Sequence, residues 1–382
     1  MRILHLSHTD IRSDSRILKE MQSIARLNPS FSIYGVGVVT RDKSSQSKLV
    51  EGINIVSINL LSRKLTLFPK FIRHSFSMVE LTMKMLFKTR KYKPQLIHCH
   101  DTLVLPLGVL LKFIFGAKLV YDAHELESNR NGLSKFLSKA TFLVEKFLWK
   151  FVDSLIVVSP SIKKWYCKYI GVKDTVVILN SPILIDETKK DGHHYFSQKF
   201  GIKETSLIFL YLGAICKGRA IDLILDVFKE FNDNDGFHVV FMGYGDMVSQ
   251  VKKAEKHHNN IHYHESVPHE DVVFISQSAD VGLCLIENVS LSDYYCLPNK
   301  LFEYAFSGIP VLASDFPDIV EVIDRHNLGS YCAVNKESIK SAIISLKDNK
   351  EFKNLKMKDL ESLSWIAQEK KLIKLYNNLL GI

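Results

Sequence analysis

The amino-acid sequence predicts an α/β protein made of two doubly wound halves that face a central cleft. Short, continuously apolar runs alternate with longer amphipathic stretches, a pattern typical of parallel sheets with helices on both faces. The alternation stops at the polar stretch 180–202 and then resumes, and the 382 residues are enough for two ordinary domains. Ligands of such sheets bind beyond the carboxyl ends of the strands, so polar motifs at those ends are the candidate functional residues.

Each half contains a series of apolar runs of strand length. In the first half we expect strands at 2–7, 32–40, 53–58, 96–98, 118–122, 154–158 and 176–179, with helices between them, for example at 15–27 and 133–151. In the second half we expect strands at 207–213, 238–243, 261–264, 281–284, 311–313 and 329–332. This pattern predicts an N-terminal domain at 1–180 and a C-terminal domain at 181–360, of which 181–204 is a polar linker.

The balance of charge and the cysteine content limit the class of protein. Fifty Lys and Arg against 41 Asp and Glu give a net charge of +9, which favours an anionic partner such as a nucleic acid, a phosphorylated ligand or an acidic membrane. Six scattered cysteines without a CxxC pair predict reduced thiols and a cytoplasmic protein. The N-terminus has a strand pattern rather than that of a signal peptide, and the longest apolar run is too short to span a bilayer.

Residues 60–93 combine a strongly basic composition with apolar side chains. They hold nine Lys or Arg against one acid, Glu80, interleaved with phenylalanines, methionines and leucines. Two interpretations remain open: surface helices with a solvated basic face, or an interfacial segment that contacts anionic lipid. Nucleic acid is the weakest alternative, and we expect no nucleic-acid partner.

A helix that begins near Pro298 places polar residues in its first turn. Proline suits this position because the first turn needs no N–H from it, and the next backbone amides point outward, which favours a phosphate. Lys300 adds a positive charge, while Asn299 and Glu303, four residues apart, share a face. The pattern suits a diphosphate with a carboxylate one turn deeper for sugar hydroxyls. The alternative is a surface cap with a solvated Glu303.

Two further loops of the second half carry weaker signals. Gly213 ends a strand and is followed by Lys217 and Arg219 before the next helix, and two cations in that place suit a phosphate. Gly243 and Gly245 form a Gly-x-Gly turn after another strand, which is a common pattern.

In the first half, His98, Cys99, His100 and Asp101 follow one another. Three interpretations of that run remain open: a metal site, the acceptor side of the cleft for His100 or Asp101, and structural hydrogen bonding. We favour the second and expect no metal. His5 and His8 are expected to be satisfied loop residues.

The ordered set of motifs resembles the family 4 glycosyltransferases, retaining enzymes of the GT-B fold that use nucleotide sugars. The second half matches through "GAICKGR", "FMGYGD", "VPHEDVVFISQSADVGLCL", "LPNKLFEYAFSGIPVLAS" and "PDIVEVI". The first half matches through "SHTDIRSDSRILKE", "LIHCHD", "LVYDAHE", "LIVVSPSIKKWY" and "VVILNSP". The likeness is greatest to bacterial members that build capsule, O-antigen or other surface polysaccharides. The end of the chain resembles the last GT-B helix, so 361–382 is expected to cross back to the first domain.

The resemblance implies roles for individual residues. Glu303 is expected to bind the ribose hydroxyls, Arg219 and Lys217 the diphosphate, and His124 the donor sugar, so that His124, Arg219 and Glu303 are the catalytic set. The remaining donor-binding candidates are Gly213, Gly243, Tyr295, Asn299, Lys300 and Leu301. The acceptor-side candidates are Arg16, His100, Asp101 and Glu125.

The sequence also departs from the family pattern. Many members carry a second glutamate where this chain has Tyr295, and Asp293 is a candidate substitute. The usual glycine pair of the first loop is replaced by "TDIRSDSR", where Asp14 and Arg16 are candidates for the missing phosphate contacts. Ala220 stands where a glycine is usual.

The function that the resemblance implies is retaining transfer of a sugar from a nucleotide sugar, with UDP favoured, to a glycan acceptor. We expect this acceptor to be lipid-linked and the transfer to take place at the inner face of the cell membrane. No cofactor is expected, because preorganised cations and amides can stabilise the departing phosphate. His124 would orient the sugar and stabilise positive charge on it. A sugar-nucleotide epimerase or phosphorylase of the same fold, and a non-catalytic nucleotide-sugar-binding module, remain as alternatives.

Overall fold

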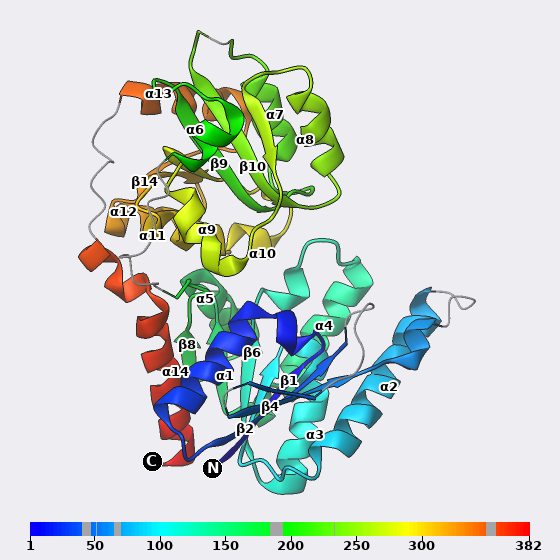
Figure 1. Cartoon of the computed structure of the whole chain (residues 1–382). Coiled ribbons are helices and arrows are strands. Elements are labelled where there is room, and N and C mark those ends of the chain that lie inside the picture. Colours follow the sequence, from blue (N-terminus) through cyan, green and yellow to red (C-terminus); the bar gives the residue numbers. More distant parts are fainter. Residues whose placement is uncertain (40–46, 51, 65–69, 184–193, 233, 349–356) are drawn as a thin grey trace. The chain divides into compact units, whose positions relative to one another are not determined.

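In a computed structural model the chain forms two compact α/β units (Figure 1). Unit 1 comprises Met1–Ile178 together with Gln368–Ile382, and unit 2 comprises Leu179–Ala367. The structure describes residues 1–39, 47–50, 52–64, 70–183, 194–232, 234–348 and 357–382.

The described residues of unit 1 form a sheet of eight strands in the order β3-β4-β2-β1-β5-β6-β7-β8. Seven strands run parallel, and β3 pairs antiparallel with β4. The strands are β1 (Arg2–Ser7), β2 (Ser32–Val38), β3 (Ser47–Val50), β4 (Ile53–Ile58), β5 (Leu96–His100), β6 (Lys118–Ala123), β7 (Ser154–Val157) and β8 (Thr175–Val177). The parallel strands were predicted from their apolar runs. The edge strand β3 was missed, because four residues that begin with Ser and Lys form no such run.

Helices connect the strands of unit 1 and cover its sheet. They are α1 (Ser15–Leu27), α2 (Lys70–Thr89), α3 (Leu105–Phe115), α4 (Lys135–Leu148), α5 (Pro160–Tyr169) and the end of α14 (Trp365–Leu380), with 3-10 turns η1 (Ile11–Ser13), η2 (Leu61–Lys64), η3 (Thr102–Val104), η4 (Glu127–Asn129) and η5 (Trp149–Phe151). Asp14 caps α1 by accepting from the Ile17 amide at 3.2 Å. This cap satisfies one of the open amides at a helix start, and it gives Asp14 a structural role in the loop where phosphate contacts were considered.

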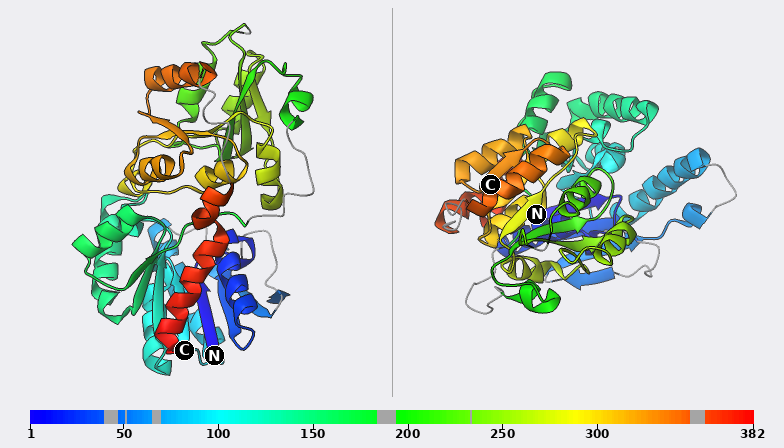
Figure 2. Two further views of the ribbon diagram at one scale, coloured as in Figure 1. Left: turned by 90° about the vertical axis from the view of Figure 1, so that its left-hand side faces the viewer. Right: turned by 90° about the horizontal axis from the view of Figure 1, so that it is seen from above.

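The C-terminal part of α14 packs beside α1 in unit 1 (Figure 2). Its Glu369 is buried and accepts hydrogen bonds from Ser23 at 2.7 Å and from Arg26 at 2.5 and 2.7 Å. A buried carboxylate requires such donors, because an unpaired charge loses its hydration. These bonds fix the chain's last helix to its first.

The described residues of unit 2 form a six-stranded parallel sheet in the order β11-β10-β9-β12-β13-β14. The strands are β9 (Leu207–Ala214), β10 (Phe237–Tyr244), β11 (Ile261–His264), β12 (Val281–Cys284), β13 (Val311–Ser314) and β14 (Gly329–Cys332). The helices are α6 (Tyr195–Phe200), α7 (Ile221–Phe228), α8 (Val248–Glu255), α9 (His269–Ser276), α10 (Leu291–Tyr294), α11 (Asn299–Phe306), α12 (Pro317–His326) and α13 (Lys336–Asp348), followed by the 3-10 segment η8 (Met357–Leu363). A core of buried apolar side chains joins β9 and β10 to α7, α8 and α13.

The stretch predicted as a linker, 181–204, is not wholly a linker. It contains helix α6, whose Phe196 is fully buried and stacks on Phe200. Six residues are too few for a strong helical pattern, and the polar sequence around them hid the helix. Residues 184–193 lie outside the described part of the chain.

Two expectations from composition can be compared with the structure. Within the described residues, no helix combines the length and the apolar character needed to cross a bilayer. All six cysteines are free thiols, with Cys99 and Cys284 buried.

We predict that Glu369→Ala lowers the free energy of unfolding by about 1–3 kcal/mol, because Ser23 and Arg26 lose a buried acceptor. Urea denaturation measures this change. The matched control is Glu321→Ala, which removes an exposed partner of Arg325 and should cost less than about 0.5 kcal/mol. Equal effects of the two substitutions would contradict the anchoring role of Glu369.

Candidate functional site in unit 2 and buried polar cluster in unit 1

Tyr304, in the second half of α11, fixes this helix against the strands of unit 2. Its hydroxyl accepts from the Leu212 amide at 2.9 Å and donates to the Leu210 carbonyl at 2.8 Å. Gly282 on β12 makes room for the ring, because a Cβ there would lie 2.2 Å from it. The helix is therefore held against β9.

Lys300 presents a buried cation at the start of this helix. Its Nζ is shielded from solvent, hydrogen-bonds to no described residue and lies 3.6 Å from the centre of the Tyr211 ring. Burial lowers the pKa of Lys300 to about 8. A buried ammonium that has a ring face but no hydrogen-bond acceptor is suited to bind an anion. The adjoining N-terminal amides of α11 favour the same charge.

Glu303 lies one turn farther along α11 and is buried. Its side chain is 11% exposed, and its Oε1 lies 3.6 Å from Nδ1 of His269 at the start of α9. The alternative of a surface cap with a solvated Glu303 is therefore wrong.

Arg219 is the second cation at these strand ends. Its guanidinium lies 3.4 Å from Oδ1 of Asp293, whose other oxygen accepts from Ser290 at 2.7 Å. Burial disfavours the Arg219 cation, but Asp293 outweighs burial and raises the pKa of Arg219. Asp293 thus lies beside the position of the missing glutamate and holds the cation in place, while Tyr295 follows directly after α10.

The loop before α7 contains Ala220 and Lys217, two further residues of the sequence motifs. Ala220 has a φ of 54°, a left-handed conformation that glycine adopts more readily. Its amide donates to Glu287 Oε1 at 2.9 Å, which joins the loops after β9 and β12. Lys217 is exposed on the same loop, and Asn299 and Leu301 lie in the first turn of α11.

The glycines at the end of β10 have a packing role. A Cβ on Gly243 would lie 1.8 Å from the Gly213 carbonyl oxygen, and one on Gly245 would lie 2.2 Å from that of Ile215. Gly213 itself has a φ of 101°. Gly243 and Gly245 therefore let the two strand ends approach closely, so the Gly-x-Gly turn is explained without a ligand.

In unit 1, Asp122 at the end of β6 lies at the centre of a buried polar cluster. Arg16 from α1 donates to both of its oxygens at 3.2 Å and also to the Ile178 carbonyl at 3.1 Å. The Arg16 side chain is 4% exposed. The prediction that Arg16 lines the acceptor side is therefore corrected: Arg16 neutralises Asp122 inside the unit.

Four histidines and a tyrosine surround Asp122. Nδ1 of His100 lies 3.0 Å from Nε2 of His124, and Nε2 of His100 lies 3.0 Å from Nδ1 of His5. The Tyr376 hydroxyl lies 2.6 Å from Nδ1 of His98 and 3.5 Å from Nε2 of His5. His100 is fully buried, so its assignment to an acceptor surface is also corrected. Structural hydrogen bonding, one of the interpretations that the sequence left open for residues 98–101, describes His98 and His100. The expectation that His5 is a loop residue is corrected, because His5 is buried in β1, and nothing in the sequence indicated that Tyr376 takes part.

The charges in this cluster are unequal. Burial disfavours the ionised form of Asp122, but Arg16 and His124 outweigh burial and hold the pKa of this carboxyl well below its usual range. Burial likewise opposes the His124 cation, yet Asp122 and Asp101 raise the pKa of His124 to about 10. His124 is therefore a cation at neutral pH. Burial lowers the pKa of His5 and His100, so both are neutral.

Some of these side chains lie close enough to share a metal ion, namely His5, Glu20, His98 and His100, or His100, Asp122 and His124. The Arg16 guanidinium, however, lies 3.2 Å from both Glu20 and Asp122. A divalent ion would lie beside that cation and would displace the hydrogen bonds between the rings. The donor set therefore fits a hydrogen-bonded network better than a metal site.

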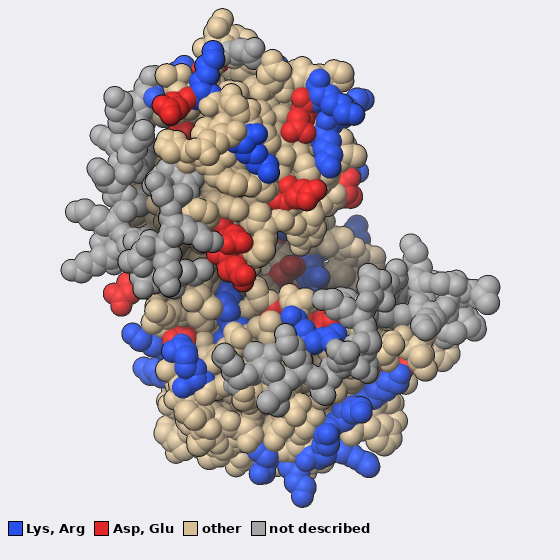
Figure 3. Space-filling view, in the orientation of Figure 1, with Lys and Arg blue, Asp and Glu red and all other residues tan. Residues whose placement is uncertain are grey.

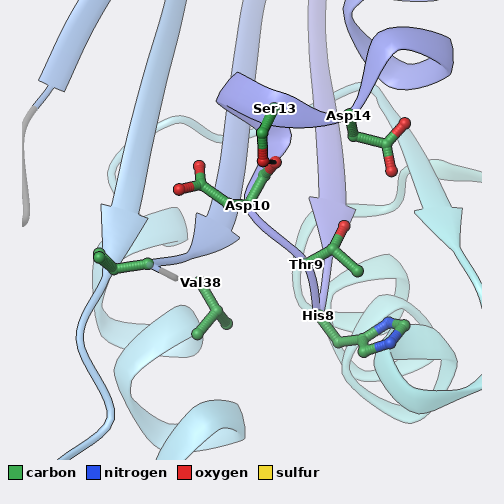
Figure 4. Close-up of a pocket in the computed structure, with 7 residues that line it drawn as sticks. His8, Thr9, Asp10, Ser13, Asp14 and Val38 are labelled. Carbon is green, nitrogen blue, oxygen red and sulfur yellow. Dashed lines mark hydrogen bonds between the residues drawn. The ribbon is translucent and has the colours of Figure 1, made fainter. Parts of the chain in front are cut away.

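A pocket of about 340 Å³ opens beside this cluster, in the loop between β1 and α1 (Figure 4). It is lined by His8, Thr9, Asp10, Ser13, Asp14, Val38 and Val39. Nδ1 of His8 lies 3.3 Å from Asp101, and Asp101 lies 3.9 Å from Nδ1 of His124. Asp101 has a φ of 71°, which is costly for a residue other than glycine and is typical of functional sites. Glu125 is 52% exposed and pairs with Arg130 at 3.2 Å.

Comparison with known proteins identifies the chain. Residues 34–183 match the profile of Glycosyltransferase Family 4, and residues 195–359 match that of Glycosyl transferases group 1. The chain belongs to the family 4, or group 1, glycosyltransferases. It is a nucleotide-sugar-dependent enzyme of the GT-B fold.

Individual relatives of this glycosyltransferase are distant. An uncharacterized glycosyltransferase of Methanocaldococcus jannaschii, MJ1607, is 22% identical over 347 residues, which cover 86% of this chain and 85% of that protein. Chitobiosyldiphosphodolichol beta-mannosyltransferase of Candida albicans is 22% identical and covers 58% of this chain and 52% of its own.

Solved structures share the fold at lower identity. Sucrose-phosphate synthase of Thermosynechococcus elongatus has a TM-score of 0.80 at 15% identity, covering 100% of this chain and 99% of that one. Anabaena HepE in complex with UDP-glucose has a TM-score of 0.74 at 12% identity, covering 99% and 100%.

We predict that Lys300→Met stabilises the ligand-free glycosyltransferase at pH 7. Because the folded pKa of Lys300 is lowered to about 8 from 10.5, folding at pH 7 carries the full cost of burying its charge. The substitution should raise the free energy of unfolding by about 1–3 kcal/mol. The gain should shrink as the pH rises above about 8 and should vanish only above 10.5, where the lysine is neutral in both states.

Urea denaturation at pH 7 and pH 10 tests this expectation, with the exposed Lys253→Met as the control. A Lys300→Met protein that is less stable than the wild type at pH 7 would show that the ammonium is stabilised by its surroundings.

Proposed function

We propose that this glycosyltransferase moves a sugar, with retention of configuration, from a UDP-sugar to a lipid-linked glycan in the synthesis of a bacterial surface polysaccharide. The observation that carries the donor part of the proposal is the buried Lys300 ammonium without a hydrogen-bond acceptor among the described residues. A nucleotide diphosphate supplies the missing acceptor. Glu303, one turn deeper on the same helix, suits the ribose hydroxyls.

The proposed reaction relies on charges that are in place before the donor binds. As the bond between sugar and phosphate breaks, negative charge grows on the departing diphosphate. Arg219, Lys300 and the amides of Asn299 and Lys300 stabilise it without rearrangement. The acceptor hydroxyl attacks the face that the nucleotide leaves, and its proton passes to the departing phosphate oxygen. Lys217 assists from the exposed loop, and Gly213 leaves room for the donor.

The role of His124 differs from the one expected from the sequence. A cationic imidazole cannot stabilise positive charge on the sugar, because like charges repel. We propose instead that His124 donates a hydrogen bond from Nδ1 to a donor oxygen and that its charge complements the departing phosphate. Asp101 and the pocket lined by His8 and Asp10 belong to the acceptor side in this proposal.

Two relatives support the choice of substrates. Anabaena HepE was solved with UDP-glucose, which supports UDP as the donor base. The Candida enzyme is named for an acceptor carried on diphosphodolichol, which supports a lipid-linked acceptor here. Such an acceptor places the enzyme in the cytoplasm, peripheral to the inner face of the cell membrane. Capsule, O-antigen and exopolysaccharide synthesis are the proposed settings.

We predict that Glu303→Ala and His124→Ala each lower the rate of sugar transfer by about 100-fold or more, because each removes an interaction made to the donor. The rate of UDP release from UDP-glucose, UDP-galactose and UDP-N-acetylglucosamine measures this, with His257→Ala as an exposed control. Full activity of both variants would overturn the site assignment. A changed sugar nucleotide in the absence of acceptor would indicate an epimerase. A sugar phosphate that forms only when phosphate is added would indicate a phosphorylase. Nucleotide binding without turnover would indicate a binding module.

The proposed membrane surface lies on α2, α3 and α4 of unit 1, where α3 packs against both neighbours. Its exposed apolar side chains are Phe76, Met78, Val79, Met83 and Phe87 on α2, Leu110, Phe113 and Ile114 on α3, and Phe136, Leu137, Leu143, Val144 and Phe147 on α4. Exposed cations accompany them, namely Lys88, Arg90, Lys91, Lys135, Lys139, Lys146 and Lys150. Lys and Arg side chains gather over α2 (Figure 3). Exposed aromatic residues beside cations suit an anionic lipid surface.

The segment 60–93 is only one part of this surface, and α4 was not expected to take part. Phe136, Leu143 and Phe147 recur at helical spacing on the outside of α4. Residues 65–69 of the basic segment, and the side chains of Lys64, Lys70 and Arg73, lie outside the described part of the chain.

We predict that the fourfold variant Lys88→Gln, Arg90→Gln, Lys146→Gln and Lys150→Gln binds anionic vesicles about 1000-fold more weakly, because each cation near such a surface contributes about 1 kcal/mol. Sedimentation with phosphatidylglycerol vesicles measures this affinity. The control replaces four exposed lysines of unit 2, Lys229, Lys252, Lys253 and Lys256, by Gln. An equal loss of vesicle affinity in the control would contradict the proposed surface, because it would show that only the net charge of the protein matters.

A further inference from the structure

Five side chains of unit 1 are connected in one series of hydrogen-bond distances. The series begins at His124 and passes through His100 and His5 to Tyr376, with spacings of 3.0, 3.0 and 3.5 Å. It ends at His98, whose Nδ1 lies 2.6 Å from the Tyr376 hydroxyl. His5, His98, His100 and Tyr376 are fully buried.

Asp122 decides the direction in which the hydrogen bonds run. An ionised carboxylate only accepts hydrogen bonds, and the Oδ2 of Asp122 faces Nε2 of His98 at 3.5 Å and Nε2 of His124 at 3.3 Å. A lone pair on either nitrogen would face negative charge. Nδ1 of His100 also lies 3.6 Å from this oxygen, but it is 3.0 Å from Nε2 of His124, so only one of those two nitrogens carries a hydrogen, and that of His124 is nearer to the carboxylate. Nε2 of His98 and Nε2 of His124 therefore carry the hydrogens.

The remaining positions follow from these two ends. With hydrogen on its Nε2, neutral His98 accepts at Nδ1, so the Tyr376 hydroxyl donates to it and accepts from Nε2 of His5. His5 then accepts at Nδ1 from Nε2 of His100, and His100 accepts at Nδ1 from Nε2 of His124. Followed from His98, the hydrogen bonds require a hydrogen on Nε2 of His124. The contact between Asp122 and His124 requires a hydrogen on the same nitrogen.

We propose that a hydrogen-bond relay of fixed direction positions His124, and that it consists of His98, Tyr376, His5 and His100. The relay holds a hydrogen on Nε2 of His124 and leaves the Nδ1–H of His124 to face the substrate. These four are positioning residues, because they act through His124. The catalytic meaning of the relay rests on the proposed function of His124, whereas its hydrogen-bond direction does not.

The relay also gives α14 a part in the site. Tyr376 belongs to the C-terminal segment that packs in unit 1, and it is the member that connects His98 with His5. The series is interrupted at Tyr376 if its hydroxyl is removed. The docking of the last helix is thereby linked to the orientation of His124.

Nitrogen-15 NMR of the labelled full-length protein tests the direction without any activity. Single His→Gln substitutions assign the four rings, and the nitrogen shifts report which nitrogen carries hydrogen. We expect His5, His98 and His100 to be neutral with hydrogen on Nε2, and His124 to be doubly protonated at pH 7.5. Hydrogen on Nδ1 of His5 or His100 would overturn the relay. So would a stoichiometric zinc ion in the purified protein that is lost in His98→Gln.

Kinetics of Tyr376→Phe test the positioning role. The expected result is about a tenfold lower kcat with the donor KM within about twofold, because the variant removes a hydroxyl from the relay and leaves the donor site intact. The matched control is Tyr166→Phe, which removes another fully buried hydroxyl of unit 1, bonded to Glu145 at 2.5 Å. Equal kinetics of the two variants would overturn the positioning role.

The two readouts separate this inference from the function on which it rests. If the NMR shows the relay and no UDP-sugar is turned over by the wild type, the proposed function fails and the hydrogen-bond direction stands. If the wild type is active and Tyr376→Phe matches it, the positioning role fails and the proposed function stands.

Discussion

The ion pair between Arg16 and Asp122 is the interaction on which the polar interior of unit 1 depends. A fully buried carboxylate costs several kcal/mol unless it is paired and hydrogen-bonded. Arg16 supplies the charge, and its third contact, to the Ile178 carbonyl, joins α1 to the chain just after β8. The Asp122 carboxylate, once paired with Arg16, also faces three histidines, namely the cationic His124 and the neutral His98 and His100. The arrangement of several strand ends therefore follows from one acidic residue.

The buried cations of unit 2 are paired differently from those of unit 1. Arg219 has a carboxylate partner in Asp293, whereas Lys300 has the face of Tyr211 and no hydrogen-bond acceptor among the described residues. Both cations lie at the carboxyl ends of parallel strands, where ligands of such sheets bind. Unit 1 balances its charges internally, while unit 2 keeps a cation that an anionic ligand completes. This difference agrees with a nucleotide-binding role for unit 2.

The sequence predicted the parallel strands well, because strands buried on both faces form continuous apolar runs. Tyr304 and Gly282 show what it could not predict: their fit depends on two segments that meet only in the fold. The motifs indicated the family, but Arg16 at the start of α1 and His100 at the end of β5 were assigned to a surface, because a polar residue at the end of an element gives no sign of its burial. The charge of His124 was also unpredictable, since it depends on Asp122 and Asp101. Helix α6 was hidden by its polar surroundings.

The most direct test of the account is thermal unfolding of the purified protein with UDP, GDP, ADP, CMP and dTDP, beside the same series for Glu303→Ala. A ligand that binds only the folded state raises the melting temperature by mass action. The account predicts a rise with UDP that is lost in Glu303→Ala, whose unliganded melting temperature should remain close to that of the wild type. No rise with any nucleotide, or an equal rise in both proteins, would contradict a nucleotide site at the start of α11.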